Sequence, residues 1–264
     1  MDLGLENKRA LVTGSTAGIG LATARMLAAE GAIVTVNGRT ERRVGAAVDL
    51  IRQQVPGAQV EGIAADLSNA AGAETVIRRL SDVDVLVNNM GIFEPVPFED
   101  ITDADWMRFF ETNVLSGIRL SRQYVSGMRR RDWGRIVFVS SESGLQIPVE
   151  MIHYGVTKTA QLAVSRGLAE SLAGTGVTVN SVLPGPTVSE GVGGFLESLA
   201  AARGVDQAAV EREFFTTARP SSILRRFATV DEVAAMIVYV CSAAASATTG
   251  AALRVDGGVV RSIA

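Results

Sequence analysis

The most constraining feature of the chain is a regular alternation of short apolar runs with longer segments of helical period. Seven runs rich in β-branched residues carry apolar side chains at nearly every position, rather than at every second one. A strand of this kind must be covered on both faces, as in a parallel sheet flanked by helices. The predicted strands are residues 9–14, 32–38, 59–65, 83–89, 134–141, 177–185 and 251–258.

The segments between these strands have the apolar spacing of amphipathic helices. The last of them begins with a capping-box pattern, Thr229 followed three residues later by Glu232. Six helices joining seven strands predict an α/β fold, a Rossmann-like doubly wound seven-stranded parallel sheet in three α/β/α layers. The predicted helices are residues 18–29, 40–54, 70–80, 103–131, 154–173 and 230–243.

A chain of 264 residues with 47% hydrophobic residues is long enough for one large domain, and we expect a single domain over residues 1–264. Residues 186–228 interrupt the alternation of strands and helices, because far more residues than usual separate the sixth strand from the last helix. We interpret this segment as a substrate-covering lid with short helices of its own. Candidate hinges are Gly191, Gly193 and Gly194, and the apolar residues that argue for packing are Phe195, Leu196, Leu199, Phe214 and Phe215.

Charge and cysteine content exclude several classes of function. A formal net charge of -3 argues against a dedicated nucleic-acid binder, which needs a basic face. Cys241 is the only cysteine, so neither an intramolecular disulfide nor a cysteine-based metal site is expected. No stretch reads as a signal peptide or as the ~18 apolar residues of a membrane span. We therefore expect a soluble cytoplasmic protein with no metal, membrane or nucleic-acid partner.

A glycine-rich turn closes the first predicted strand and opens the first predicted helix. It reads TGSTAGIG from Thr13 to Gly20, with further glycines at Gly14 and Gly18. Glycines permit a tight turn there, and the free amides and dipole of the helix start attract a pyrophosphate. The turn therefore predicts a dinucleotide site.

The end of the second predicted strand bears on the choice of dinucleotide. Enzymes that use NAD carry an acidic residue there to bind the ribose 2′-hydroxyl, whereas this chain has Arg39 after Gly38. A guanidinium can grip a 2′-phosphate, so NADP(H) is favoured. An Arg39 that stacks on adenine or faces solvent leaves NAD(H) as the alternative.

Tyr154 and Lys158 are four residues apart in a predicted helix, so both side chains project from one face. A phenol that exchanges a proton with a carbonyl or alcohol benefits from a neighbouring ammonium, which stabilises the phenolate. Lys158 is one of two lysines among 25 basic residues. Such a pair also arises by chance, but Ser141 ends a strand where α/β sheets bind ligands and would polarise the same carbonyl. His153 points about 100° away from Tyr154 and is interpreted as structural or pocket-lining.

Taken together, these motifs identify a resemblance. The chain resembles the short-chain dehydrogenase/reductase family over essentially its whole length, and within it the 3-oxoacyl-[acyl-carrier-protein] reductase branch. Met90 stands where the family has alanine and Ser189 where it often has threonine, and neither removes a polar role. The motifs, in order, are TGSTAGIG, NNMG at 88–91, ETNVLSG at 111–117, Ser141, YGVTK, VNSVLPGPT at 179–187 and LRVDGG.

The resemblance implies a site. Asn113, Ser141, Tyr154 and Lys158 would form a catalytic tetrad, with Asn113 holding a water that links Lys158 to solvent. Asp66 and Leu67 would lie beside the adenine, Asn89 and Gly91 along its ribose, and residues 184–187 beside the nicotinamide carboxamide. The implied cofactor-binding residues are Gly14, Thr16, Gly18, Ile19, Gly20, Arg39, Asp66, Leu67, Asn89, Gly91, Tyr154, Lys158, Pro184, Gly185 and Thr187.

Two functions follow as hypotheses. The first is an NAD(P)(H)-dependent oxidoreductase that moves a hydride between the nicotinamide and a small-molecule ketone or secondary alcohol, with Tyr154 as general acid/base. The second is a non-catalytic dinucleotide-binding sensor or scaffold, which is expected to have lost the tyrosine, lysine or serine. The resemblance also implies a homotetramer, or a homodimer, joined through residues 103–131 and 154–173.

Overall fold

The computed structural model describes residues 2–263, and the backbone alone at positions 190, 191, 195, 196, 198 and 199. The expected packing of Phe195, Leu196 and Leu199 concerns side chains and therefore lies outside what is described, whereas the backbone of Gly191, an expected hinge, lies in the helix Glu190–Arg203.

Seven parallel strands form one sheet in the order β3-β2-β1-β4-β5-β6-β9. This order reverses between β1 and β4, so the two halves of the sheet wind in opposite directions from that point. The prediction of a doubly wound seven-stranded parallel sheet is confirmed. The strands are β1 (Arg9–Val12), β2 (Ile33–Gly38), β3 (Val60–Ala64), β4 (Val85–Asn88), β5 (Gly134–Val139), β6 (Val177–Pro184) and β9 (Ala252–Val255).

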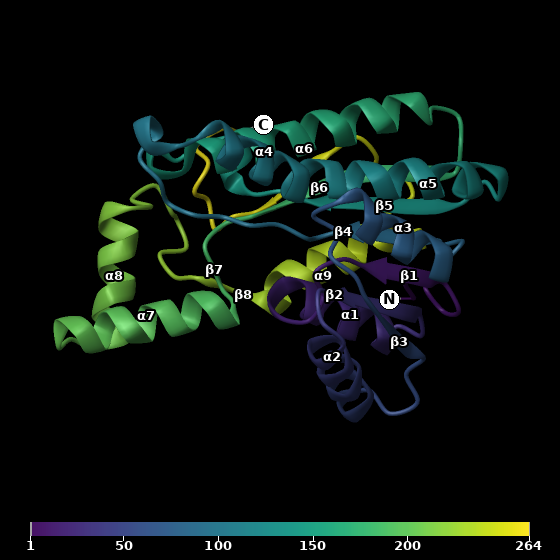
Figure 1. Cartoon of the computed structure of the whole chain (residues 1–264), viewed down its shortest axis with the longest axis horizontal. Helices are drawn as coiled ribbons and strands as arrows, with labels where there is room; N and C mark the ends of the chain where they lie inside the picture. Colours follow the sequence, from purple (N-terminus) through teal and green to yellow (C-terminus); the bar gives the residue numbers. More distant parts are fainter. Residues whose placement is uncertain (1, 264) are drawn as a thin grey trace.

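Helices cover both faces of the sheet, giving the predicted three layers (Figure 1). One layer contains α1, α2 and α9, and the other contains α3, α5 and α6. The described helices are α1 (Gly18–Ala29), α2 (Glu41–Gln54), α3 (Ala70–Arg79), α4 (Asp103–Phe110), α5 (Ser116–Arg130), α6 (Ile152–Ser171), α7 (Glu190–Arg203), α8 (Gln207–Thr217) and α9 (Val230–Cys241).

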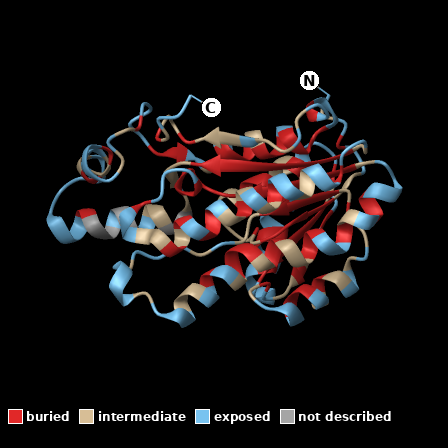
Figure 2. Cartoon of the chain, turned by 90° about the horizontal axis from the view of Figure 1, so that it is seen from above, coloured by how far each residue is buried: buried red, intermediate tan, exposed pale blue. Residues whose placement is uncertain are grey.

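The apolar runs of the strands serve two cores at once. Val12 and Val87 pack in the cluster beneath α1 and α9, while their neighbours Leu11 and Leu86 pack in the cluster beneath α3 and α5. All four side chains are fully buried, and burial of each stabilises the fold by about 1.5–3 kcal/mol. Figure 2 shows the resulting buried sheet between two layers whose outer surfaces are exposed. Alternation between faces explains why the runs are continuously apolar.

The prediction of one helix over residues 103–131 is wrong in one respect. α4 and α5 are separated by a single π-helical turn, Glu111–Leu115, centred on Asn113. One extra residue in this turn opens the backbone hydrogen-bond ladder and leaves carbonyl oxygens for other donors, an arrangement that recurs at functional sites. The hydroxyl of Ser116 donates to one of them, the oxygen of Thr112, over 2.6 Å.

Residues 186–228 contain the short helices that were expected, α7 and α8, which stand beside the sheet (Figure 1). They share a small apolar core of their own, built on Val210, Phe215 and Phe227. Two strands that were not predicted, β7 (Thr187–Val188) and β8 (Ala228–Thr229), pair in parallel at the ends of the segment. Gly193 and Gly194, proposed as hinges, lie inside α7 rather than in a loop.

None of the described helices combines the length and apolar character needed to cross a membrane.

Candidate active site

The glycine turn follows β1 at the point where the strand order reverses. Gly14 and Gly18 adopt left-handed backbone angles, φ 60° and 57°, which glycine tolerates best. A Cβ on Gly20 would lie 2.5 Å from Asn89 Nδ2 and 2.6 Å from the Gly14 oxygen. The residue before α1, Ala17, supplies no side-chain cap, so the first amides of α1 are left for another acceptor. The turn therefore fits a pyrophosphate.

Hydrogen bonds tie this turn to the end of β4. The side-chain amide of Asn89 donates to the oxygens of Thr13, over 2.9 Å, and Gly14, over 3.1 Å. In return, the Thr13 hydroxyl accepts from the amides of Asn89 and Met90, each over 3.0 Å. Asn89 therefore holds the shape of the turn, in addition to the ribose contact implied for it.

The residues expected around the adenosine lie at the ends of β2 and β3. Arg39 is exposed just after β2, and Thr16 packs so closely on Gly38 that a Cβ there would lie 2.4 Å from the threonine methyl. Asp66 is exposed and accepts a hydrogen bond from the Ser68 amide over 3.0 Å. The Leu67 side chain is fully buried in the core, so this residue offers a ligand its backbone and not its side chain.

A cavity of about 450 Å³ opens at the carboxyl ends of the strands. Ser141, Tyr154 and Lys158 line it together with a largely apolar wall that includes Phe93 and Phe214. Asn113 and the residues of the glycine turn other than Ile19 do not line it, and neither do Arg39, Asp66 and Leu67. The other predicted cofactor-binding residues that line it are Ile19, Asn89, Gly91, Pro184, Gly185 and Thr187.

Tyr154 and Lys158 project from the first two turns of α6, with Lys158 Nζ 5.5 Å from the centroid of the tyrosine ring. Lys158 is 4% exposed, and its ammonium donates to the Val139 oxygen over 2.9 Å. Burial lowers the pKa of Lys158 to about 7. Desolvation raises the pKa of Tyr154 to about 12, opposed by a hydrogen bond with Ser141. Without cofactor or substrate, the Tyr154 phenol is therefore protonated at neutral pH.

Asn113 does not line the cavity and is buried in the π turn. Its side-chain amide donates to the Ile92 oxygen over 3.0 Å and to the Thr157 hydroxyl over 2.9 Å. Its main-chain oxygen accepts from Gln161 Nε2 over 2.6 Å, and Gln161 Oε1 accepts from Lys158 Nζ over 3.2 Å. Gln161 thus joins two members of the predicted tetrad. Gln161 was not predicted from the sequence, although its position one turn after Lys158 on the same helical face was a usable signal.

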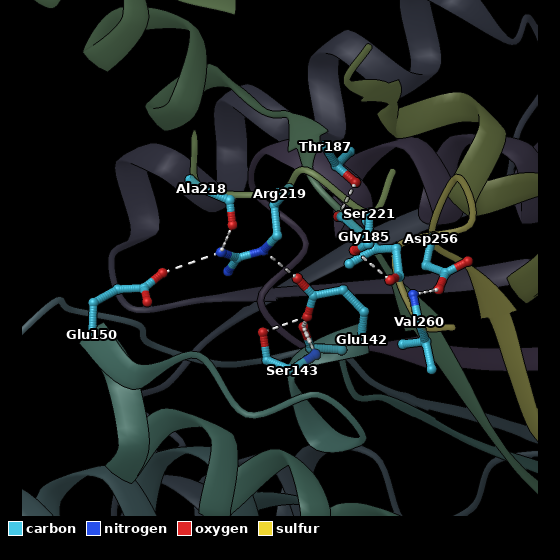
Figure 3. Close-up of polar contacts among 12 residues, drawn as sticks. Glu142, Ser143, Glu150, Gly185, Thr187, Ala218, Arg219, Ser221, Asp256 and Val260 are labelled. Atoms are coloured by element: carbon cyan, nitrogen blue, oxygen red, sulfur yellow. Dashed lines mark hydrogen bonds and ion pairs between the residues drawn. The ribbon is translucent and has the colours of Figure 1, made fainter. Parts of the chain in front are cut away.

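A buried ion pair beside Ser141 was also missed. Glu142 is 4% exposed, and Arg219 Nε donates to its Oε1 over 3.0 Å (Figure 3). The other carboxylate oxygen, Oε2, accepts from the Ser141 hydroxyl over 3.0 Å and from the Ser143 hydroxyl. Arg219 also reaches Glu150, over 3.2 Å. All three charged side chains line the cavity.

His153 faces away from the cavity, as expected from its angle to Tyr154. It is fully buried against Phe109, with ring centroids 3.9 Å apart, and against Trp106, at 6.1 Å. Burial lowers the pKa of its imidazole. A neutral ring packed between aromatic side chains has a structural role.

Among the described residues, no group of three or more histidine, cysteine, aspartate or glutamate side chains lies close enough together to hold a metal ion.

A glycine turn that fits a pyrophosphate lies at the switch point of a parallel sheet, near a tyrosine and a buried lysine. This combination is typical of one class of protein, the dinucleotide-dependent α/β oxidoreductases. Comparison with known proteins makes this specific. The family model described as short chain dehydrogenase matches residues 8–198, and the chain belongs to that family.

Its relatives include the uncharacterized oxidoreductase YvaG of Bacillus subtilis (strain 168), 45% identical over 263 residues and over the full length of both chains. The 3-oxoacyl-[acyl-carrier-protein] reductase of Aquifex aeolicus (strain VF5) is 31% identical, over 98% of this chain and 100% of its own, which agrees with the predicted branch. Among solved structures, L-sorbose reductase from Gluconobacter frateurii, complexed with NADPH and L-sorbose, has a TM-score of 0.93 at 30% identity and full coverage of both chains.

The family and these relatives establish the reaction class. The chain is an NAD(P)(H)-dependent oxidoreductase that acts on CH–OH and C=O groups. The NADPH in the sorbose reductase structure agrees with the preference for NADP(H) predicted from Arg39. None of the relatives named above supports the non-catalytic sensor.

Proposed function

We propose that this protein is an NADP(H)-dependent reductase of small-molecule ketones, in which Tyr154 is the proton donor. The observation that carries the proposal is the convergence of Ser141, Tyr154 and Lys158 on one cavity, next to residues 184–187. The bound nicotinamide supplies the hydride for reduction and accepts it for oxidation. The chain's own residues must therefore place the carbonyl and deliver one proton to its oxygen.

Each residue has a distinct part in that proton transfer. Tyr154, whose pKa is raised, keeps its proton at neutral pH and donates it to the ketone oxygen as the alcohol forms. The Ser141 hydroxyl would turn from Glu142 and donate its one hydrogen bond to the same oxygen, and the Lys158 ammonium stabilises the phenolate that remains. Asn113 and Gln161 hold Lys158 in place through the hydrogen bonds described above.

A carbonyl screen tests this proposal. The purified protein is mixed with NADPH and a panel of aliphatic, hydroxylated and cyclic ketones, and loss of absorbance at the nicotinamide band is followed. We expect turnover of at least one ketone, and alcohol formed in equal amount to NADPH consumed. NADPH binding without reduction of any ketone would favour the sensor instead.

Arg39 is expected to set the cofactor preference. In the Arg39→Ala variant, kcat/KM for NADPH should fall about tenfold or more, because a charge-assisted hydrogen bond to the 2′-phosphate is lost. The value for NADH should change little. Arg78→Ala, which removes the same charge from an exposed pair with Glu74, is the matched control. A wild-type preference for NADH would contradict the assignment.

The proposal extends to the organisation of the protein. Residues 1–264 form one domain, and residues 186–228 act as a lid over the cavity. The protein works in the cytoplasm, where its single buried free thiol, Cys241, stays reduced.

The protein assembles as a homotetramer, or a homodimer, through α4, α5 and α6. Exposed Met107 and Phe110 on α4 support such an interface. Light scattering should give a mass of two or four chains, and a monomeric mass would refute the assembly.

A further inference from the structure

We propose that Glu142 and Arg219 form a hydroxyl-recognition pair in the substrate cavity. The pair selects ketones that carry a hydroxyl group on a carbon next to the carbonyl, and disfavours ketones that carry a carboxylate there. The inference rests on the proposed ketone reduction and names the substrate class for it.

The two side chains reach the same spot from distant parts of the chain. Glu142 follows Ser141 directly, after β5, whereas Arg219 follows α8 at the end of the lid segment, 77 residues away. Figure 3 shows the guanidinium between the carboxylates of Glu142 and Glu150. Since the Ser141 hydroxyl donates to Glu142 over 3.0 Å, the pair lies one hydrogen bond from the group that would hold the ketone oxygen.

Both partners keep unused hydrogen-bonding capacity. A carboxylate offers about four lone-pair sites. In Glu142, three of these sites accept hydrogen bonds, from Arg219, Ser141 and Ser143. A guanidinium has five N–H donors, and Arg219 uses three of them: Nε donates to Glu142, and Nη1 donates to Glu150 and to the Ala218 oxygen. Within the described part of the chain, no atom accepts a hydrogen bond from its Nη2. An acceptor and a donor therefore remain side by side.

A hydroxyl group matches this arrangement, because it donates one hydrogen bond and accepts others. A methyl or methylene at the same place would exclude water and leave both charged groups with unsatisfied hydrogen bonds. Sites built in this way discriminate strongly against analogues that lack the polar group. Met151 and Phe214, which also line the cavity, are apolar and offer a substrate no hydrogen bond.

The charge of the cluster opposes an anionic substrate. Glu142 and Glu150 contribute two negative charges and Arg219 one positive charge, so the three groups carry a net charge of -1. The guanidinium already pairs with both of these carboxylates, which would repel a substrate carboxylate bound at its remaining donor, Nη2. Lys158 is the only other cationic side chain among the described residues that line the cavity, and it lies beside Tyr154. A carboxylate substrate therefore finds no free cation near the pair.

Three four-carbon ketones that differ only at C1 test this inference: 1-hydroxybutan-2-one, butan-2-one and 2-oxobutanoate. With the NADPH-loaded wild-type enzyme, kcat/KM for the hydroxyketone should exceed that for each of the other two by about tenfold or more. In Glu142→Gln, which keeps the size of the side chain but not its charge, the preference for the hydroxyketone over butan-2-one should fall at least about fivefold. The value for butan-2-one itself should change much less.

A matched control and clear contrary outcomes accompany this test. Glu213→Gln removes an exposed carboxylate of α8, which pairs with Arg203 over 2.8 Å outside the cavity, and should retain the wild-type preference. Equal rates with the hydroxyketone and butan-2-one in the wild type would overturn the inference without any variant. An equal loss with both ketones in Glu142→Gln would also overturn it, since Glu142 would then act only by positioning Ser141. A protein that reduces no ketone would overturn the proposed function as well.

Discussion

Replacing Tyr154 by phenylalanine should lower kcat for ketone reduction by about 10²-fold or more, with little change in NADPH affinity. The substitution removes one oxygen and leaves the ring, so the cavity keeps its shape. Without the phenol, the proton must come from water, and a positioned general acid is worth about 10²–10⁴-fold in rate. Steady-state kinetics with an accepted ketone, together with NADPH titration by fluorescence, measure the two effects separately.

The other tyrosines provide the control. Tyr239 lies on α9 and is 39% exposed, away from the cavity, so Tyr239→Phe should retain wild-type kinetics. A Tyr154→Phe enzyme with near-wild-type kcat would show that another group donates the proton.

Replacing Lys158 by methionine should cost about 10²-fold or more in kcat/KM. The side chain is buried, and its ammonium lies 5.5 Å from the centroid of the Tyr154 ring, so its loss removes a charge that stabilises the phenolate. Lys8→Met is a matched control, because it removes the other lysine of the chain, which lies over the Trp133 ring at 4.0 Å. That variant should remain active. Full activity in Lys158→Met would exclude the proposed role.

The Lys158→Met variant should also be more stable than the wild type at low pH. Burial lowers the pKa of Lys158 from 10.5 to about 7, so below pH 7 the folded protein carries a buried charge that disfavours folding. Between pH 7 and 10.5 the unfolded chain binds the extra proton, and this penalty fades as pH rises. The Tm of Lys158→Met without cofactor should therefore exceed that of the wild type at pH 6, with a smaller gap at pH 9.5. Thermal melts at both pH values measure this, and a gap that widens with pH would contradict the assignment.

The fold was largely predictable because its main signals are local. Each strand's continuous apolar run reports two covered faces, and Val12 and Leu11 show the two cores that result. The π turn at Asn113 escaped prediction because one added residue in a helix shifts the apolar spacing too little to be seen in a single sequence. The two-residue strands β7 and β8 are too short to leave a periodic signal.

Some residues of the site were predictable from the sequence, and others were not. Tyr154, Lys158 and Ser141 stand in recognisable motifs, and the structure brings them to one cavity. The contact between Glu142 and Arg219 spans 77 residues and depends on how residues 186–228 bring Arg219 back to the end of β5. No spacing rule links two such positions, so only the tertiary structure reveals that they meet.

The pairing of β7 with β8 has a consequence for how such a protein diversifies. Thr187 lies opposite Ala228 and Val188 opposite Thr229, so the two ends of the intervening segment are fastened to each other. A loop with fixed ends can change in length and sequence at little entropic cost to the rest of the fold. We therefore expect changes in the length of the segment between these two strands to disturb the sheet little, provided that the contacts of Arg219, Ile223 and Leu224 with the rest of the chain are kept. Substitutions there would change side chains that line the cavity, such as Val192 and Phe214, while the sheet, the glycine turn and Tyr154 keep their places.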